Sequence, residues 1–202
     1  MENLSQHLLP LAGLLGFHLI FFRRFYFINP YTYARSEPLE HEFPSSRLLG
    51  ENLRRGKFAF HDPYFWGDFN AQPINASFYP PHMVQAWIGS FLPLDKAWIL
   101  YSAMMVFHYL LASIFAYTLF NSLKVSATLA FFGAVTLTHF SYCIKQNSSI
   151  AYTLTWLPLL LLGSLSHSTT TFGISLGMII LAGYWPLGIY MGVAGCLAWL
   201  CF

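Results

Sequence analysis

Charge is scarce in this chain, and acidic residues are missing from its second half. Only 9% of the 202 residues are charged and 56% are hydrophobic, whereas a soluble domain carries about 25% charged residues. All eight acids lie before residue 96, and Lys124 and Lys145 are the only formal charges in 97–202. Because a charge near the bilayer centre costs roughly 2.5–3.5 kcal/mol, this distribution predicts lipid-facing helices and excludes a soluble surface for 97–202.

The chain also lacks the short motifs that mark common catalytic and cofactor sites. It has no phosphate-binding glycine loop, nucleophile elbow, dinucleotide-binding glycine signature or zinc-protease helix. Cys143, Cys196 and Cys201 show no Cys-x-x-Cys spacing and lie in or beside apolar stretches, so we interpret them as free, packed thiols. No basic run accompanies the net charge of +2, and we expect no nucleic-acid partner.

The apolar runs predict an all-α membrane protein of about six transmembrane helices. The first run ends at Arg23-Arg24, and we assign 4–28 to the first span. It is not read as a signal peptide, because no Lys or Arg precedes it and no small-residue cleavage site follows. The bundle 97–202 holds about five further apolar runs, at 97–120, 127–143, 150–165, 172–185 and 187–202. The last run reaches the final residue, which indicates a fragment or a truncated relative of a larger protein.

Residues 29–96 predict one large polar, aromatic-rich loop between the first and second spans. This segment holds eight of the eleven prolines and seven of the eight acids. We expect two short helices within it that lie in the membrane interface. One covers 45–55 and opens with a serine cap. The other covers 82–92, with an apolar stripe of Met83, Val84, Trp87, Ile88 and Phe91.

Part of this loop carries a recognisable pattern. Residues 56–67 read Gly-Lys-Phe-Ala-Phe-His-Asp-Pro-Tyr-Phe-Trp-Gly, followed by Gln72-Pro73 and by Ser-Phe-Tyr-Pro-Pro at 77–81. The pattern resembles the first extracytoplasmic loop of the YfhO-type family of bacterial polytopic membrane proteins, which are similar to C-type glycosyltransferases. Ala59, His61 and Asp62 stand where that family favours proline, tryptophan and asparagine. The likeness covers about 36–195, which corresponds to only the N-terminal portion of the family.

The resemblance implies an activity, a location and partners. It implies a multi-pass protein of the inner cell membrane that transfers a sugar from a polyprenyl-phosphate donor at the outer face. The expected partners are membrane lipid, the polyprenyl-phosphate sugar and a second chain that completes the fold. The donor's leaving phosphate requires cationic side chains or a divalent cation, and the sequence itself specifies no cofactor.

The resemblance also implies site residues in the loop. The family places an acid about twenty residues before the glycine at Gly56, which makes Glu37 one catalytic candidate, and Asp62 is the other. Glu40 and Glu42 become the equivalent acid if the register slips. Arg54 and Arg55 would bind the donor phosphate or, as such clusters do more often, lipid headgroups. The substrate-binding candidates are Glu42, Arg54, Arg55, Tyr64, Trp66, Asp68, Gln72 and Tyr79.

The histidines have different expected roles. His108 and His139 lie within apolar spans, where we expect them to face the bundle interior and form hydrogen bonds between helices. His41 and His61 would join a metal site with Glu42 or Asp62, but their spacing matches no standard metal motif. We therefore assign no metal ligands.

Two questions stay open at the level of the sequence. The family orientation puts Arg23 and Arg24 outside and leaves only Lys124 clearly inside, which the positive-inside rule does not favour. Two other functions remain: a non-catalytic membrane binding or assembly subunit, and an inactive remnant.

Overall fold

The computed structural model describes residues 4–30, 42–57, 78–142, 148–183 and 185–201. These residues form helices and turns without a strand, which confirms the expected all-α fold. The helices are α1 Leu4–Phe21, the π-helical turn η1 Arg24–Ile28, α2 Phe43–Arg54, α3 Pro80–Gly89, α4 Leu94–Ser122, α5 Ala127–Tyr142, α6 Ser148–Thr155, α7 Leu157–Leu165, α8 Thr169–Leu181 and α9 Trp185–Cys201.

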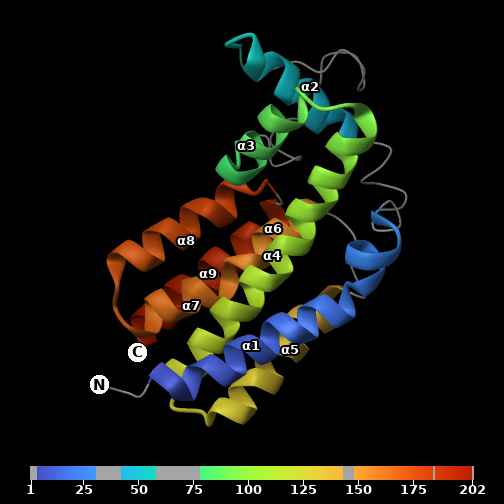
Figure 1. Cartoon of the computed structure of the whole chain (residues 1–202). Helices are drawn as coiled ribbons and strands as arrows, with labels where there is room; N and C mark the ends of the chain where they lie inside the picture. The colour runs from blue at the N-terminus through green and yellow to red at the C-terminus, as the bar shows by residue number, and fades with distance from the viewer. Residues whose placement is uncertain (1–3, 31–41, 58–77, 143–147, 184, 202) are drawn as a thin grey trace.

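Helix α4 is the axis of the molecule. It packs against α1 and α5 on one side and against α6 and α7 on the other, while α8 and α9 pack onto α7. Helices α2 and α3 lie together at one end of the bundle, and both chain termini lie at the other end (Figure 1). The two helices that lie within the predicted loop 29–96 are thus placed at the end of α4 that carries Asp95.

Within the described residues, α4 is the one helix that is long and apolar enough to cross a membrane. Its 29 residues extend about 43 Å at 1.5 Å per residue, which exceeds a hydrocarbon core of about 30 Å. The other apolar helices are shorter, and they overlap the predicted runs, although α8 and α9 begin before the runs 172–185 and 187–202. Of the six expected spans, one is therefore represented among the described residues by a helix of sufficient length.

Three buried clusters hold the helices together. The largest is mainly aromatic and joins η1, α2, the N-cap of α3, α4 and α6 through Phe25, Phe43, Tyr79, Tyr101 and Tyr152. A second cluster packs α1 against α4 and α5, where the small residues Ala116, Ala130 and Ala134 face Leu14. Small side chains let helix backbones approach closely, and the larger Tyr117, Phe120 and Phe131 complete this second contact.

Proline and glycine place several helix ends differently from the sequence expectation. The predicted serine cap of the 45–55 helix is wrong, because α2 begins at Phe43 with Pro44 in its first turn and Glu42 at the N-cap. Proline suits that position since its missing N–H would be unpaired there anyway. The predicted span 150–165 is two helices, α6 and α7, which meet at Trp156 just before Pro158.

The boundary between the last two helices also differs. Gly183 follows α8 with φ 85°, and Pro186 lies inside the first turn of α9 rather than between two runs. A positive φ is costly for residues with a Cβ, so the glycine ends α8 and the proline is accommodated in the next helix.

Candidate functional site

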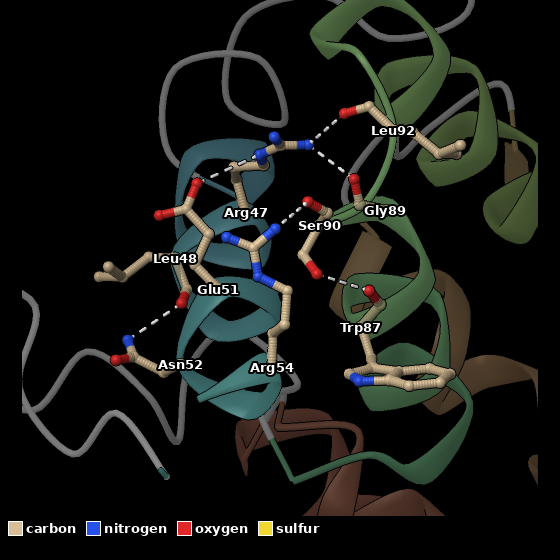
Figure 2. Close-up of polar contacts among 9 residues, drawn as sticks. All are labelled: Arg47, Leu48, Glu51, Asn52, Arg54, Trp87, Gly89, Ser90 and Leu92. Carbon is tan, nitrogen blue, oxygen red and sulfur yellow. Dashed lines mark hydrogen bonds and ion pairs between the residues drawn. The ribbon is translucent and has the colours of Figure 1, made fainter. Parts of the chain in front are cut away.

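Helices α2 and α3 form a tightly packed pair at the end of the bundle. A Cβ added at Gly50 would lie 2.0 Å from the Ala86 carbonyl oxygen, so only glycine allows this approach. Arg47 donates from Nη1 to the carbonyl oxygen of Gly89, the last residue of α3, at 2.6 Å and to that of Leu92 at 2.9 Å (Figure 2). Its Nε also lies 3.4 Å from Glu51. The two carbonyl contacts tie α2 to the end of α3 and to the turn that follows it.

Arg54 and Arg55 lie exposed at the end of α2. Arg54 donates to the carbonyl oxygen of Ser90 at 3.3 Å, and its guanidinium lies 5.6 Å from the centre of the Phe91 ring. Figure 2 shows Arg54 reaching from α2 across to the end of α3. The arginine is therefore positioned on an aromatic surface while it remains accessible.

Helix α3 faces the bundle with its polar side. His82, Gln85, Ala86 and Gly89 are buried, whereas Val84, Trp87, Ile88 and the following Phe91 are exposed. The predicted apolar stripe thus points outward beside Arg54. An exposed apolar stripe with a cation at its edge is typical of a helix at a membrane interface.

Beneath α3 lies a buried polar cluster that spans three helices. His108 of α4 uses Nδ1 to donate to the Met104 carbonyl oxygen at 2.7 Å, which leaves Nε2 to accept from the Tyr79 hydroxyl at 2.7 Å. The Tyr79 oxygen in turn accepts from Trp156 Nε1 at 2.8 Å. Because each group has a partner, this network ties the start of α3 to α4 and to the junction of α6 and α7.

Two further groups extend this polar cluster. Glu42 is 5% exposed and accepts a hydrogen bond from the Tyr101 hydroxyl at 2.7 Å. His82 is 2% exposed, and its Nδ1 has no hydrogen-bond partner among the described residues. Burial, followed by the proximity of His108, lowers the pKa of His82 to about 4. Burial raises the pKa of the Tyr79 phenol, and the hydrogen bond from Trp156 lowers it by a smaller amount.

The structure describes four of the predicted site residues. Arg54 and Arg55 are exposed at the end of α2, while Glu42 and Tyr79 are buried in the polar cluster. Tyr79 uses its hydroxyl within the protein and, as it stands, presents no ring face for a sugar. Six other candidates lie outside the described residues: Glu37, Tyr64, Asp62, Trp66, Asp68 and Gln72. Both candidate catalytic acids are among them.

Sequence reasoning placed His108 and His139 correctly in the interior, since both are buried. It missed His82, Tyr101, Tyr152 and Trp156 as members of one cluster. The sequence offered one indication of this cluster, namely the residue types, because Tyr, Trp and His side chains need polar partners when they are buried. A linear sequence does not say which partners they meet.

A small pocket of ≈ 50 Å³ lies between α4, α5, α6 and α7. Its lining is mainly apolar, with Thr138 and Thr155 as polar members. Their hydroxyls donate to the carbonyl oxygens of Ala134 and Ala151 in their own helices. The cavity thus suits hydrocarbon better than a polar ligand.

Metal-binding capacity is limited in the part of the chain that is described. No group of three or more His, Cys, Asp or Glu residues comes together there. His41, His61 and Asp62, which the metal hypothesis combined with Glu42, lie outside the described residues. The divalent cation implied by the family resemblance therefore stays a prediction.

In comparisons with known proteins, no family model, no curated protein and no solved structure matches this chain.

Proposed function

We propose that this chain is a multi-pass membrane protein that forms the N-terminal part of a glycosyltransferase-like assembly. In this proposal it binds a polyprenyl-phosphate sugar at the outer membrane face and takes part in transfer of the sugar. The membrane part of the proposal rests on the polarity of the bundle surface. The proposed ligand is inferred from the exposed arginines. The proposed sugar transfer is inferred from the family resemblance, which is an analogy.

The bundle exposes many large apolar side chains and also buries many polar ones. Exposed apolar residues include Leu9, Ile20, Leu129, Phe132, Ile174, Ile189, Val193, Leu197 and Leu200. Buried polar residues include His18, Ser113, Thr138, His139, Thr155, Ser164 and Ser175. A soluble protein seldom exposes so many large apolar side chains, whereas polar groups within a membrane face the bundle interior. The exposed apolar side chains together with the buried polar ones are the observation that favours several spans.

The short helices are compatible with this proposal. Helices α5, α8 and α9 have 16, 13 and 17 residues, fewer than the roughly 20 that a straight span requires. A membrane accommodates short spans by local thinning and by flanking residues that reach the interface. The turns 123–126 and 166–168 lie toward the same end of the molecule as both termini (Figure 1), as expected if the helices cross back and forth.

The exposed end of α2 and α3 suits a lipid phosphate. Arg54, Arg55 and Lys57 are exposed, and Arg54 lies against Phe91 beside the outward apolar stripe. A phosphate attached to a long hydrocarbon chain needs both features: guanidinium donors for the oxygens and an apolar surface for the chain.

Binding in lipid nanodiscs tests this proposal. The purified chain is given a polyprenyl phosphate or the uncharged polyprenol of the same length. We expect preference for the phosphate and about a fivefold loss for each of Arg54→Gln and Arg55→Gln, since a basic residue near a membrane surface contributes about 1 kcal/mol. Lys124→Gln, a control at the other end of α4, leaves binding unchanged. Equal binding of both lipids, or an Arg54/Arg55 double variant that binds normally, contradicts the proposal.

A non-catalytic binding subunit is the second candidate. Glu42, the one candidate acid that the structure describes, is buried against Tyr101 and is not presented to a substrate. Sugar release from a loaded donor separates the two functions. If the chain binds the donor without transferring the sugar, and Glu37→Gln and Asp62→Asn bind equally well, the subunit is favoured. If the chain transfers the sugar and these variants do not, the enzyme is supported.

A further inference from the structure

A second buried polar group lies at the interface of α1 and α5, away from the arginines and the α3 cluster. His18 and His139 are 0% and 2% exposed. Their ring centres are 5.8 Å apart, with 70° between the ring planes. The two imidazoles come from helices that are far apart in sequence and are packed together with α4.

Each imidazole has one nitrogen engaged and one without a partner. His18 Nε2 lies 3.2 Å from the Tyr26 hydroxyl, and His139 Nδ1 lies 2.9 Å from the Thr138 hydroxyl. His18 Nδ1 and His139 Nε2 have no hydrogen-bond partner among the described residues. An unsatisfied buried polar atom costs about 1–3 kcal/mol. Two such atoms on neighbouring rings therefore point to a ligand.

The engaged nitrogens resemble the arrangement found around metal-bound histidines. In such sites the second ring nitrogen is held by a hydrogen bond, which sets the tautomer and ring orientation. Tyr26 holds His18 in this way, and Thr138 holds His139. Thr138 is itself held, because its hydroxyl donates to the Ala134 carbonyl oxygen at 2.7 Å and lies 2.8 Å from Ser113 Oγ.

The number and kind of ligands select the metal. No third His, Cys, Asp or Glu joins the pair within the described residues, whereas zinc sites usually have three or four protein ligands. A ring-centre separation of 5.8 Å leaves room for one ion, because two metal–nitrogen bonds of about 2 Å and two half-rings together extend roughly 6 Å. Copper(I) accepts imidazole ligands and forms stable linear complexes with two of them.

The surroundings favour a single positive charge. Phe17, Phe21 and Phe22 have ring centres 5.0, 5.0 and 6.0 Å from that of His139, and Phe22 lies 4.7 Å from His18. Aromatic faces attract cations, while burial of a divalent ion without a carboxylate is much more costly. We propose that His18 and His139 bind one copper(I) ion between α1 and α5. This proposal does not depend on the proposed lipid ligand.

Copper binding by the full-length chain tests this site. Cys143, Cys196 and Cys201 are first changed to serine, so that thiols do not bind the metal. The chain is given copper(I) anaerobically against a competing chelator. We expect about one copper per chain and an X-ray absorption spectrum with two nitrogen neighbours and no sulfur.

Variants distinguish this site from incidental binding. His18→Gln and His139→Gln lower the affinity by at least tenfold, since loss of an outer hydrogen bond alone costs about 10–100-fold. His82→Gln is the matched control, because it alters another buried histidine with an unpartnered nitrogen and leaves copper binding unchanged. Thermal unfolding without copper identifies variants that do not fold, and Tyr26→Phe then serves as the milder change. The proposal is overturned if the chain binds no copper or if the spectrum shows sulfur ligands. It is also overturned if both histidine variants bind copper as tightly as the chain that keeps His18 and His139.

Discussion

Four buried histidines show how differently one residue type is used in this molecule. His108 is satisfied at both nitrogens, by Met104 and Tyr79. His18, His82 and His139 each keep one nitrogen without a hydrogen-bond partner in the described part of the chain. A satisfied histidine mainly stabilises helix packing, whereas an unsatisfied one is energetically costly and is a candidate for a functional role.

At the residue scale, His82 predicts a dependence of stability on pH. Its pKa falls from 6.5 to about 4 in the folded protein, so the unfolded chain takes up a proton first as the pH decreases. The contribution of a neutral His82 to the free energy of unfolding is complete above pH 6.5. Toward pH 4 the free energy of unfolding decreases progressively, by up to about 3 kcal/mol.

Thermal unfolding in detergent between pH 7.5 and 4 measures this dependence. We expect the melting temperature of His82→Gln to decrease less steeply with falling pH than that of the original chain. Identical slopes for the two proteins would show that His82 is not buried in its neutral form.

At the element scale, the contact between α2 and α3 depends on one missing side chain. Gly50 admits the Ala86 carbonyl, and Arg47 bonds the end of α3. The pair in turn sets the place of Arg54 against Phe91. A small residue far from the proposed phosphate contact thus controls its geometry.

Gly50→Ala is expected to destabilise the protein by about 1–3 kcal/mol, because the added Cβ overlaps backbone atoms that cannot give way. Gly173→Ala is the matched control, since nothing lies within 4 Å of its added Cβ and alanine favours a helix by up to about 1 kcal/mol. Chemical denaturation of both variants tests the pair. A Gly50→Ala protein as stable as the control would mean that α2 and α3 are not in close contact.

At the scale of the whole molecule, α4 separates two buried polar groups. The Tyr79, His108 and Trp156 network lies where α3 and α6 meet α4, and the His18 and His139 pair lies where α1 and α5 meet. The outer surface of the bundle remains apolar. Polar contacts between helices contribute specificity where lipid offers no hydrophobic driving force for helix association.

Cysteine accessibility in intact cells tests the membrane arrangement. In a chain without native cysteines, single cysteines replace the exposed residues Lys57, Ser122 and His167. Six spans with the loop outside predict that only position 57 is labelled from outside. Labelling of position 122 but not 167, or the reverse, would contradict two crossings between them, and a protected position 57 would exclude the outer-face donor.

Much of the helical layout follows from local sequence. The apolar run 97–120 predicted α4, which extends from Leu94 to Ser122, because helix formation requires only a continuous favourable segment. The errors occurred at helix ends, where Pro44 began α2 early and Pro158 divided a predicted helix. A proline lacks the N–H that continues a helix, and its effect depends on whether it falls in a first turn.

The candidate sites divide in the same way. The sequence by itself determined an all-helical chain with scarce charge, an aromatic-rich segment between the first two apolar runs and arginines at a helix end, since these depend on composition and order. Only the tertiary structure decided that Tyr79 meets His108 and Trp156 and that His18 lies beside His139. Those contacts arise from packing between distant segments, because the periodicity of a single helix selects an inward face without identifying the partner that it meets.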